Sequence, residues 1–192
     1  MVRLRVVGYL SPEAKCLLAV VGDGPRDALI LREVASKLNG HRGASLALTQ
    51  LPLTERKGLS ALEGVVELLN RGYRVEGVLL LVDKEHVASF KAVEDWLRKR
   101  GFDTAYLQEL GPKAAVLEAS RGHRRLKVYL AVAGDSKSME EDVEKLTREV
   151  CRKEVGELEM ASLKRLIQRA SVDQVRRAFD GLAKALEAIL EL

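Results

Sequence analysis

Residues 75–85 read VEGVLLLVDKE, an apolar stretch that ends in Asp83-Lys84-Glu85. The run from Val75 to Val82 has the length and composition of a β-strand that is buried on both faces. A helical pattern follows from about His86 to Arg100 and stops at Gly101. These residues predict a strand, an acidic turn and a helix in succession, the unit from which parallel sheets are built.

A second unit of the same kind precedes this one. Lys15–Val21 is typical of a buried strand, the turn Gly22-Asp23-Gly24 follows, and Pro25 suits the first position of a helix that runs to about Leu38. Further elements are expected from apolar spacing and turn residues: strands at 2–9 and 44–51, and a helix at 60–72 that begins in a capping box. The alternation predicts an α/β fold with a largely parallel sheet flanked by helices.

The second half of the chain has a different pattern. A short strand begins near Thr104, and 114–119 with 126–133 predict a β-hairpin around a turn at 120–123. A capping box at Ser138 begins a helix to about Val150, and two amphipathic stretches follow at 157–170 and 172–190. We expect an α/β domain at 1–156 and a C-terminal helical appendage at 157–192 packed on it. A homodimer or partner-protein interface through these helices is the alternative.

Composition limits the class of protein. Hydrophobic residues make up 47% of the 192 residues and charged ones 31%, which predicts a globular chain and excludes a disordered or fibrous one. No apolar run approaches the ~20 residues that cross a bilayer, and no secretory signal is visible, so we expect a cytoplasmic protein without a membrane partner. The charge-rich composition resembles that of hyperthermophile proteins.

Net charge and cysteine content are less decisive. The 32 basic and 28 acidic side chains give a net charge of +4, which permits DNA or RNA as a partner without requiring one. Cys16 and Cys151 lack a metal-binding spacing, and we expect both to be small core residues. A disulfide between them stays open.

Carboxylates follow three of the expected strands. The acids are Asp23 after 17–21, Asp83 and Glu85 after 79–82, and Asp135 after 128–133. Ligands of open α/β sheets bind outside the carboxyl ends of the strands, so these acids are candidates for one site. Clustered carboxylates repel one another, and a hard cation such as Mg²⁺ relieves the repulsion. Each acid alone also fits ordinary turn and helix-cap chemistry, so the prediction depends on the coincidence of three.

The same stretches resemble the Toprim family. Residues 21–27, VGDGPRD, resemble its first motif, and residues 80–85, LLVDKE, resemble its second, an apolar strand that ends in Asp-x-Asp. Residues 130–142 are similar to the ending of small stand-alone Toprim-like proteins of archaea and bacteria. The resemblance covers residues 15–150 and implies a Toprim-like, Rossmann-like sheet.

The resemblance also implies a role for each matching residue. The implied roles are a general acid or base at Asp23, a Mg²⁺ site (Mn²⁺ being the alternative ion) at Asp83 and Glu85 that Asp135 or Glu141 completes, and phosphate or nucleic-acid contacts at Gly24 and Asp27. The family usually has Glu at the first of these positions and Asp at the position of Glu85. Both departures keep the charge and change the reach of the side chain by one methylene.

Basic residues crowd the turn of the expected hairpin. Arg121, Arg124 and Arg125 are candidates for contacts with nucleic-acid phosphates, and we expect them to supply positive potential beside the acidic site. Lys137 is a further candidate for a phosphate. A solvated turn on a charge-rich surface is the alternative. His86 is expected to be a residue of the first helical turn rather than a metal ligand.

Two hypotheses follow. In the first, the chain is a Mg²⁺-dependent nuclease or phosphotransfer enzyme that acts on DNA, RNA or another phosphate-bearing substrate. In the second, it is a catalytically inactive nucleic-acid-binding or protein-interaction module with the same fold. Carboxylate oxygens of Asp23, Asp83 and Glu85 within reach of one metal ion would favour the first hypothesis.

Overall fold

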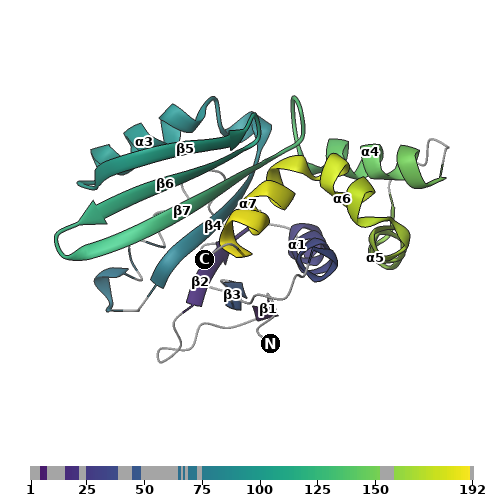
Figure 1. Cartoon of the computed structure of the whole chain (residues 1–192), viewed down its shortest axis with the longest axis horizontal. Coiled ribbons are helices and arrows are strands. Elements are labelled where there is room, and N and C mark those ends of the chain that lie inside the picture. The colour runs from purple at the N-terminus through teal and green to yellow at the C-terminus, as the bar shows by residue number, and fades with distance from the viewer. Residues whose placement is uncertain are drawn as a thin grey trace.

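The computed structural model describes residues 5–7, 16–21, 25–38, 45–48, 65, 67, 69–72, 75–151 and 158–190. Within these ranges seven strands form one sheet in the order β1-β3-β2-β4-β7-β6-β5 (Figure 1). The strands are β1 (Arg5–Val7), β2 (Cys16–Val20), β3 (Ser45–Leu48), β4 (Val75–Asp83), β5 (Asp103–Gly111), β6 (Ala114–Arg121) and β7 (Arg124–Ala133).

The sheet is mostly parallel, as the alternating pattern predicts. Five strands are parallel to one another, in the order β1, β3, β2, β4 and β7. β6 pairs antiparallel with β7, and β5 pairs antiparallel with β6 at the end of the sheet. The expected hairpin is confirmed as β6 and β7, with Gly122 in the left-handed region at φ 60°. The strands that precede the two acidic turns, β2 and β4, are parallel neighbours, so they end at the same edge of the sheet.

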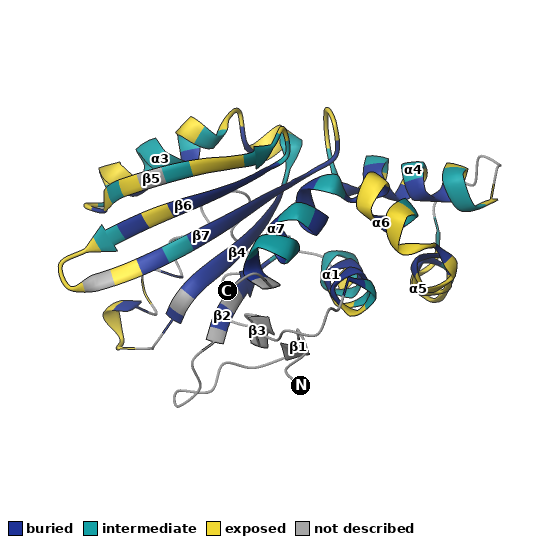
Figure 2. Ribbon diagram, viewed as in Figure 1, coloured by how far each residue is buried: buried dark blue, intermediate teal, exposed yellow. Residues whose placement is uncertain are grey.

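Helices cover both faces of this sheet (Figure 1). The described helices are α1 (Pro25–Lys37), α3 (Phe90–Lys99), α4 (Met139–Cys151), α5 (Met160–Arg169), α6 (Val172–Ala178), α7 (Asp180–Leu190) and the short 3₁₀-helix η3 (Lys84–His86). Side chains alternate along β4: Leu79 and Leu81 pack with α1 and α4–α7, while Val78, Leu80 and Val82 pack with α3. The protein is therefore a three-layer α/β structure in which the buried strands form the middle layer, between two layers of helices (Figure 2).

One helix begins later than its sequence predicts. The expected start at His86 is wrong, because residues 84–86 form η3 and α3 begins after Ser89, whose side chain accepts a hydrogen bond from the Ala92 N–H (3.3 Å). A serine oxygen satisfies a helix N-terminus better than the apolar and basic residues before it. His86 consequently stays at the end of β4 instead of entering the helix.

The last amphipathic stretch also differs from expectation, since it divides at Phe179 into α6 and α7. A capping box between Ser171 and Gln174 begins α6, as the sequence predicts. Gly181 then lies so near the sheet that an added Cβ would meet the carbonyl oxygens of Val132 and Lys113 at 2.5 and 2.7 Å. The helix changes direction there and continues across β7.

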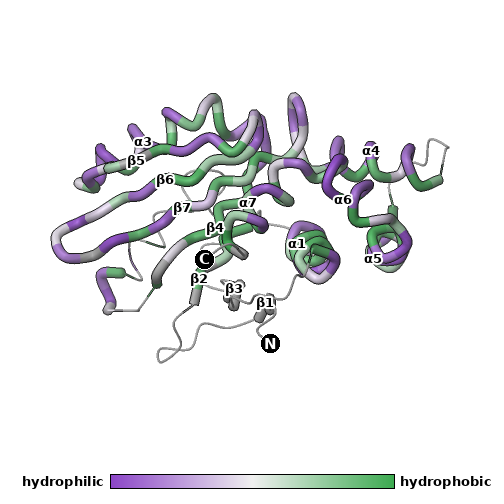
Figure 3. The backbone as a smooth tube through the Cα atoms, in the orientation of Figure 1, coloured by the Kyte–Doolittle hydropathy of each residue, from purple (hydrophilic) through white to green (hydrophobic). Residues whose placement is uncertain are grey.

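The C-terminal helices share one core with the sheet. Phe179 and Leu186 are fully buried in the cluster that also contains Ile30 of α1 and Tyr129 of β7. Hydrophobic residues concentrate along β4, β6 and β7, whereas the β6–β7 turn and part of α5 are hydrophilic (Figure 3). The expected domain boundary at residue 156 lies outside the described residues.

Cys151 is exposed with a free thiol, so the expectation that it is a core residue is wrong. The side chain of Cys16 lies outside the described residues. None of the helices that the structure describes has both the length and the apolar character needed to span a membrane.

Candidate metal centre

The candidate site lies where β4 ends. Asp83 is the last residue of β4 and is level with Ala133, the last residue of the parallel strand β7. The β7–α4 loop (residues 134–138) folds back over this edge: the Lys137 carbonyl accepts a hydrogen bond from the Glu85 N–H (3.0 Å), and the Met139 N–H donates to Oδ1 of Asp83 (3.0 Å). Two strand ends and the start of α4 therefore meet at the acidic turn.

Three side chains gather at this turn. Asp83, Glu85 and His86 each offer one ligand atom, and these atoms lie within 4.8 Å of one another. Asp83 is partly buried, while Glu85 and His86 are exposed, with Nε2 of His86 at 3.8 Å from Oε1 of Glu85. Among the residues that the structure describes, this is the group of His, Cys, Asp and Glu side chains close enough to hold one metal ion.

The environment of Asp83 disfavours its charge. Burial raises the pKa of Asp83 above its ordinary value, and the nearby carboxylates of Glu140 and Glu85 act in the same direction. The Met139 N–H and the imidazole of His86 oppose this rise of the pKa. A cation at the cluster would offset the repulsion between the carboxylates and favour the ionised form of Asp83.

Sequence reasoning did not identify His86 as a candidate ligand. It placed this residue in the first turn of the following helix. The signal that was available is the spacing Asp83-x-Glu85-His86, because a single 3₁₀ turn brings the second and third residues after a strand back toward its last residue.

Asp135 is engaged in ion pairs. Its carboxylate lies 2.7 Å from Nζ of Lys113 and also contacts Nζ of Lys145. The hydrogen bond from Lys113, together with the one from Lys145, lowers the pKa of Asp135 to about 2. The described geometry thus places Asp135 with two lysines, outside the cluster of Asp83, Glu85 and His86.

Asp142 shares Lys113 with Asp135 and was not among the residues expected at the site. It is only 2% exposed, accepts a hydrogen bond from the Gly134 N–H (2.9 Å) and contacts Nζ of Lys113 (3.1 Å). Burial raises the pKa of Asp142, while the Gly134 N–H and Lys113 counteract the rise. Sequence reasoning missed it because an acid in the first turn of a helix normally stays exposed and stabilises the helix dipole.

Glu141 binds the backbone of the β7–α4 loop. Its Oε2 accepts hydrogen bonds from the N–H groups of Asp135 (2.6 Å), Ser136 (2.9 Å) and Lys137 (3.3 Å), and its Oε1 accepts one from the Ser136 hydroxyl. These bonds, led by that of the Ser136 side chain, lower the pKa of Glu141 to about 2. The expected capping-box residue therefore reaches back beyond Ser138 to three residues of the loop.

The first Toprim-like motif is described only in part. Asp23 and Gly24 lie outside the described residues. The expectation that the Asp23 carboxylate lies within reach of one metal ion together with Asp83 and Glu85 therefore stays a prediction. Asp27 lies in the first turn of α1. Its neighbour Arg26 approaches Glu140 of α4 (3.9 Å), which places the N-terminal ends of α1 and α4 at the same edge of the sheet.

The basic hairpin turn is far from the acidic cluster. Arg121, Arg124 and Arg125 lie where β6 meets β7, whereas Asp83 is level with Ala133 at the other end of β7. At ~3.3 Å per residue, the length of β7 separates the two by ~30 Å. The expectation that these arginines lie beside the acids is wrong, because a hairpin puts its turn at the amino end of the returning strand.

The hairpin turn has a neighbour that the sequence did not indicate. The Arg121 guanidinium lies over the ring of Phe102 with 5.8 Å to the ring centroid.

The backbone of Lys137, by contrast, belongs to the loop at the acidic edge, and its side chain is exposed there. Of the expected phosphate-binding residues with described side chains, Lys137 and Asp27 are thus at the edge of the candidate site.

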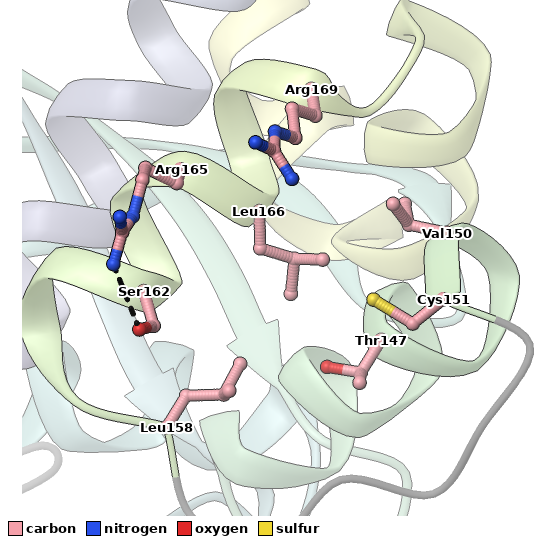
Figure 4. Close-up of a pocket in the computed structure, with 8 residues that line it drawn as sticks. All are labelled: Thr147, Val150, Cys151, Leu158, Ser162, Arg165, Leu166 and Arg169. Carbon is pink, nitrogen blue, oxygen red and sulfur yellow. Dashed lines mark hydrogen bonds between the residues drawn. The ribbon is translucent and has the colours of Figure 1, made fainter.

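A cavity of about 300 Å³ lies between the C-terminal half of α4 and α5 (Figure 4). Its wall combines apolar residues, among them Leu158 and Leu166, with Arg169 and with Arg165, whose Nη2 donates to the Ser162 hydroxyl (3.4 Å). The acidic cluster meets α4 at its other end, at Met139. The cavity is therefore separate from the candidate metal centre.

Comparison of the chain with models of protein families, with curated proteins and with solved structures gives no significant match. The similarity to Toprim proteins consequently rests on the short motifs in the sequence.

Proposed function

We propose that this chain binds Mg²⁺, with Mn²⁺ as the alternative ion, at Asp83 and Glu85, and that it acts on nucleic acid or another phosphate ester. The observation that carries the proposal is the cluster of Asp83, Glu85 and His86, whose ligand atoms lie within 4.8 Å of one another. Carboxylate oxygens are the ligands that Mg²⁺ prefers. Carboxylate ligands suit Mn²⁺ as well.

The surroundings of the cluster support a phosphate-bearing substrate. The N-terminal ends of α1 and α4 lie at this edge, and helix N-termini favour anions. A bound divalent cation would polarise a phosphoryl oxygen and neutralise charge that develops on it. In this proposal Asp23, three residues after the end of β2, supplies the general acid or base that the Toprim-like resemblance implies.

We further propose that the fold is Toprim-like. Two features support this assignment: β2 and β4 are parallel neighbours, and each is followed in the sequence by one of the acidic motifs. The C-terminal helices α5–α7 would then be additions to that fold.

A cleavage assay tests the proposed activity. Labelled single-stranded and duplex DNA and RNA are incubated with the protein in Mg²⁺, Mn²⁺ or EDTA. We expect cleavage that requires the cation and that falls by at least about tenfold in Asp83→Asn and in Glu85→Gln. Glu118→Gln is the matched control, since Glu118 is an exposed carboxylate on β6. Cleavage that persists in EDTA, or that both site variants retain, would contradict the proposal.

A catalytically inactive nucleic-acid-binding module is the second candidate. It is favoured by the hydrogen bond from Met139, which already occupies one oxygen of Asp83, and by the ~30 Å between the basic hairpin and the cluster. In this case the protein binds oligonucleotides without cleaving them. Oligonucleotide binding that is equal in Mg²⁺ and in EDTA, with no product in either, would favour this candidate over the first.

A further inference from the structure

We propose that Glu141 is a positioning residue of the metal centre and not one of its ligands. It holds the β7–α4 loop in the conformation that places Asp83 and Glu85 for a cation. This inference rests on the proposed function, because it assigns a role toward the same site. The argument follows the hydrogen bonds from Glu141 to the loop and from the loop to the acidic turn.

The first step is the contact between Glu141 and the loop. Both carboxylate oxygens have partners within their own segment: Oε2 accepts from three consecutive backbone N–H groups at 135–137, and Oε1 accepts from the Ser136 hydroxyl. Consecutive N–H groups converge on one oxygen only when the backbone curves around it. Glu141 therefore fixes the curvature of the loop.

The second step joins the loop to the acidic turn. The last residue held by Glu141, Lys137, accepts a hydrogen bond from the Glu85 N–H (3.0 Å), and Met139, two residues further, donates to Asp83 (3.0 Å). These two bonds fix the backbone of one candidate ligand and the carboxylate of the other. A change in the curvature of the loop would therefore move both.

The opposite end of the loop is anchored independently of Glu141. Gly134 donates its N–H to the buried carboxylate of Asp142, which also pairs with Lys113. Loss of the Glu141 side chain would leave this anchor in place and release the part of the loop nearest to Asp83 and Glu85. The expected effect is thus local and reaches the metal centre without unfolding the edge of the sheet.

A conservative substitution separates positioning from direct ligation. A glutamine at position 141 keeps an oxygen that accepts from the loop N–H groups, and its amide can donate to the Ser136 hydroxyl. It lacks the negative charge that a Mg²⁺ or Mn²⁺ ligand supplies. Positioning therefore predicts that Glu141→Gln retains the cation affinity that Glu141→Ala loses, whereas ligation predicts that both variants lose it.

Calorimetric Mn²⁺ titration of the 192-residue chain and its variants measures this difference. We expect Glu141→Ala to weaken binding by about tenfold or more, in the range typical of residues that orient metal ligands, and Glu141→Gln to stay within about threefold of the wild type. Glu144→Ala is the control, an exposed acid on the same helix. Equal losses in Ala and Gln variants would identify Glu141 as a ligand and overturn the inference, as would unchanged affinity in Glu141→Ala.

Amide hydrogen exchange without metal gives a second, separate readout. We expect the Glu85 N–H to exchange faster in Glu141→Ala than in the wild type, while the N–H of Leu80 in the centre of β4 is unchanged. Failure of the wild type to bind Mn²⁺ would refute the proposed function. Unchanged exchange at Glu85 would refute the positioning link itself, whether or not the cation binds.

Discussion

The acidic side chains at the carboxyl edge of the sheet have opposite electrostatic environments. Burial raises the pKa of Asp83 and Asp142, whereas hydrogen bonds lower the pKa of Asp135 and Glu141 to about 2. The two acids with a lowered pKa bind lysines or the loop backbone. Asp83 and Glu85 lie instead at the end of β4, where their carboxylate oxygens come within 4.8 Å of each other and of a ring nitrogen of His86.

The lowered pKa of Glu141 has a measurable consequence for stability. Because its pKa is about 2 in the folded protein against an ordinary 4.5, the ionised form stabilises the fold above pH 4.5, and this contribution disappears as the pH falls toward 2. We expect the free energy of unfolding in urea to be lower for Glu141→Gln at neutral pH. The difference in the free energy of unfolding between the wild type and Glu141→Gln should narrow as the pH falls from 4.5 toward 2. A difference that does not change with pH would contradict the hydrogen-bonded geometry.

At the scale of single residues, sequence patterns predicted part of the site. Asp83 and Glu85 follow a buried strand, so their place at the edge of the sheet could be inferred from periodicity alone. His86 was missed because it was placed in the following helix, although its spacing from Asp83 and Glu85 was an available local signal. Asp142 could not be predicted, because its contact with Lys113 joins residues 29 positions apart and local patterns do not encode such contacts.

The β7–α4 loop shapes the surroundings of Asp83 and Glu85 at the end of β4. It begins at Gly134, which has a φ of 76°, and an added Cβ there would lie 2.4 Å from the Ser138 carbonyl oxygen. The tight return of the chain brings the start of α4 against Asp83. A glycine is required both by the left-handed backbone and by the lack of space.

Alanine substitution at two glycines separates these requirements. At Gly122 in the β6–β7 turn, φ is 60° and nothing lies within 4 Å of an added Cβ, so Gly122→Ala should lower the free energy of unfolding by only about 1–2 kcal/mol. Gly134→Ala adds the steric conflict with Ser138, so it should destabilise the fold more and also weaken cation binding. Urea denaturation compares the two variants. Equal losses of stability would show that the loop is not as tightly packed as the structure indicates.

Most elements agree with their sequence patterns, and the exceptions have local causes. The strand at 75–83, the hairpin and the capping box at Ser171 are confirmed. The start of α3 was misplaced because Ser89 is a better cap than the residues before it. The division of the last helical stretch at Phe179 could not be predicted, since it results from the contact of Gly181 with the sheet.

The described residues form two hydrophobic cores, one on each face of the sheet. The larger cluster joins α1 and the sheet to α4–α7, and the other lies under α3. The acidic cluster lies at the carboxyl ends of the parallel strands. The β6–β7 turn with its arginines lies at the opposite end of the strands. Any ligand that contacts both would have to extend along the length of the strands.

Because of this shared core, we expect the C-terminal helices to be necessary for folding. A chain that ends at residue 156 loses Phe179 and Leu186, both fully buried, and exposes the face of the sheet that they cover. We expect this truncated chain to bind a hydrophobic dye and to lack a cooperative thermal transition. In the full chain, Phe179→Ala should lower the free energy of unfolding by about 3–5 kcal/mol. Cooperative unfolding of the truncated chain at the temperature of the full chain would show that the helices are a separate unit.

The sequence predicted the α/β class and the mostly parallel sheet because the period and length of apolar runs reflect burial on both faces. It did not predict the strand order, in which β3 lies between β1 and β2, since that order depends on contacts between distant segments. It also misplaced the basic hairpin relative to the acids. The hairpin was predicted, but not that its turn lies at the end of the strands opposite the acids.

We propose that Asp83, Glu85 and His86 form a divalent-cation site. The most direct test is isothermal titration calorimetry of the 192-residue chain with Mg²⁺ and Mn²⁺, repeated on Asp83→Asn with Glu118→Gln as the control. We predict saturable binding of one cation per chain by the wild type and the control, and loss of that binding in Asp83→Asn. Absence of binding to the wild type, or equal binding by Asp83→Asn, would contradict the claim.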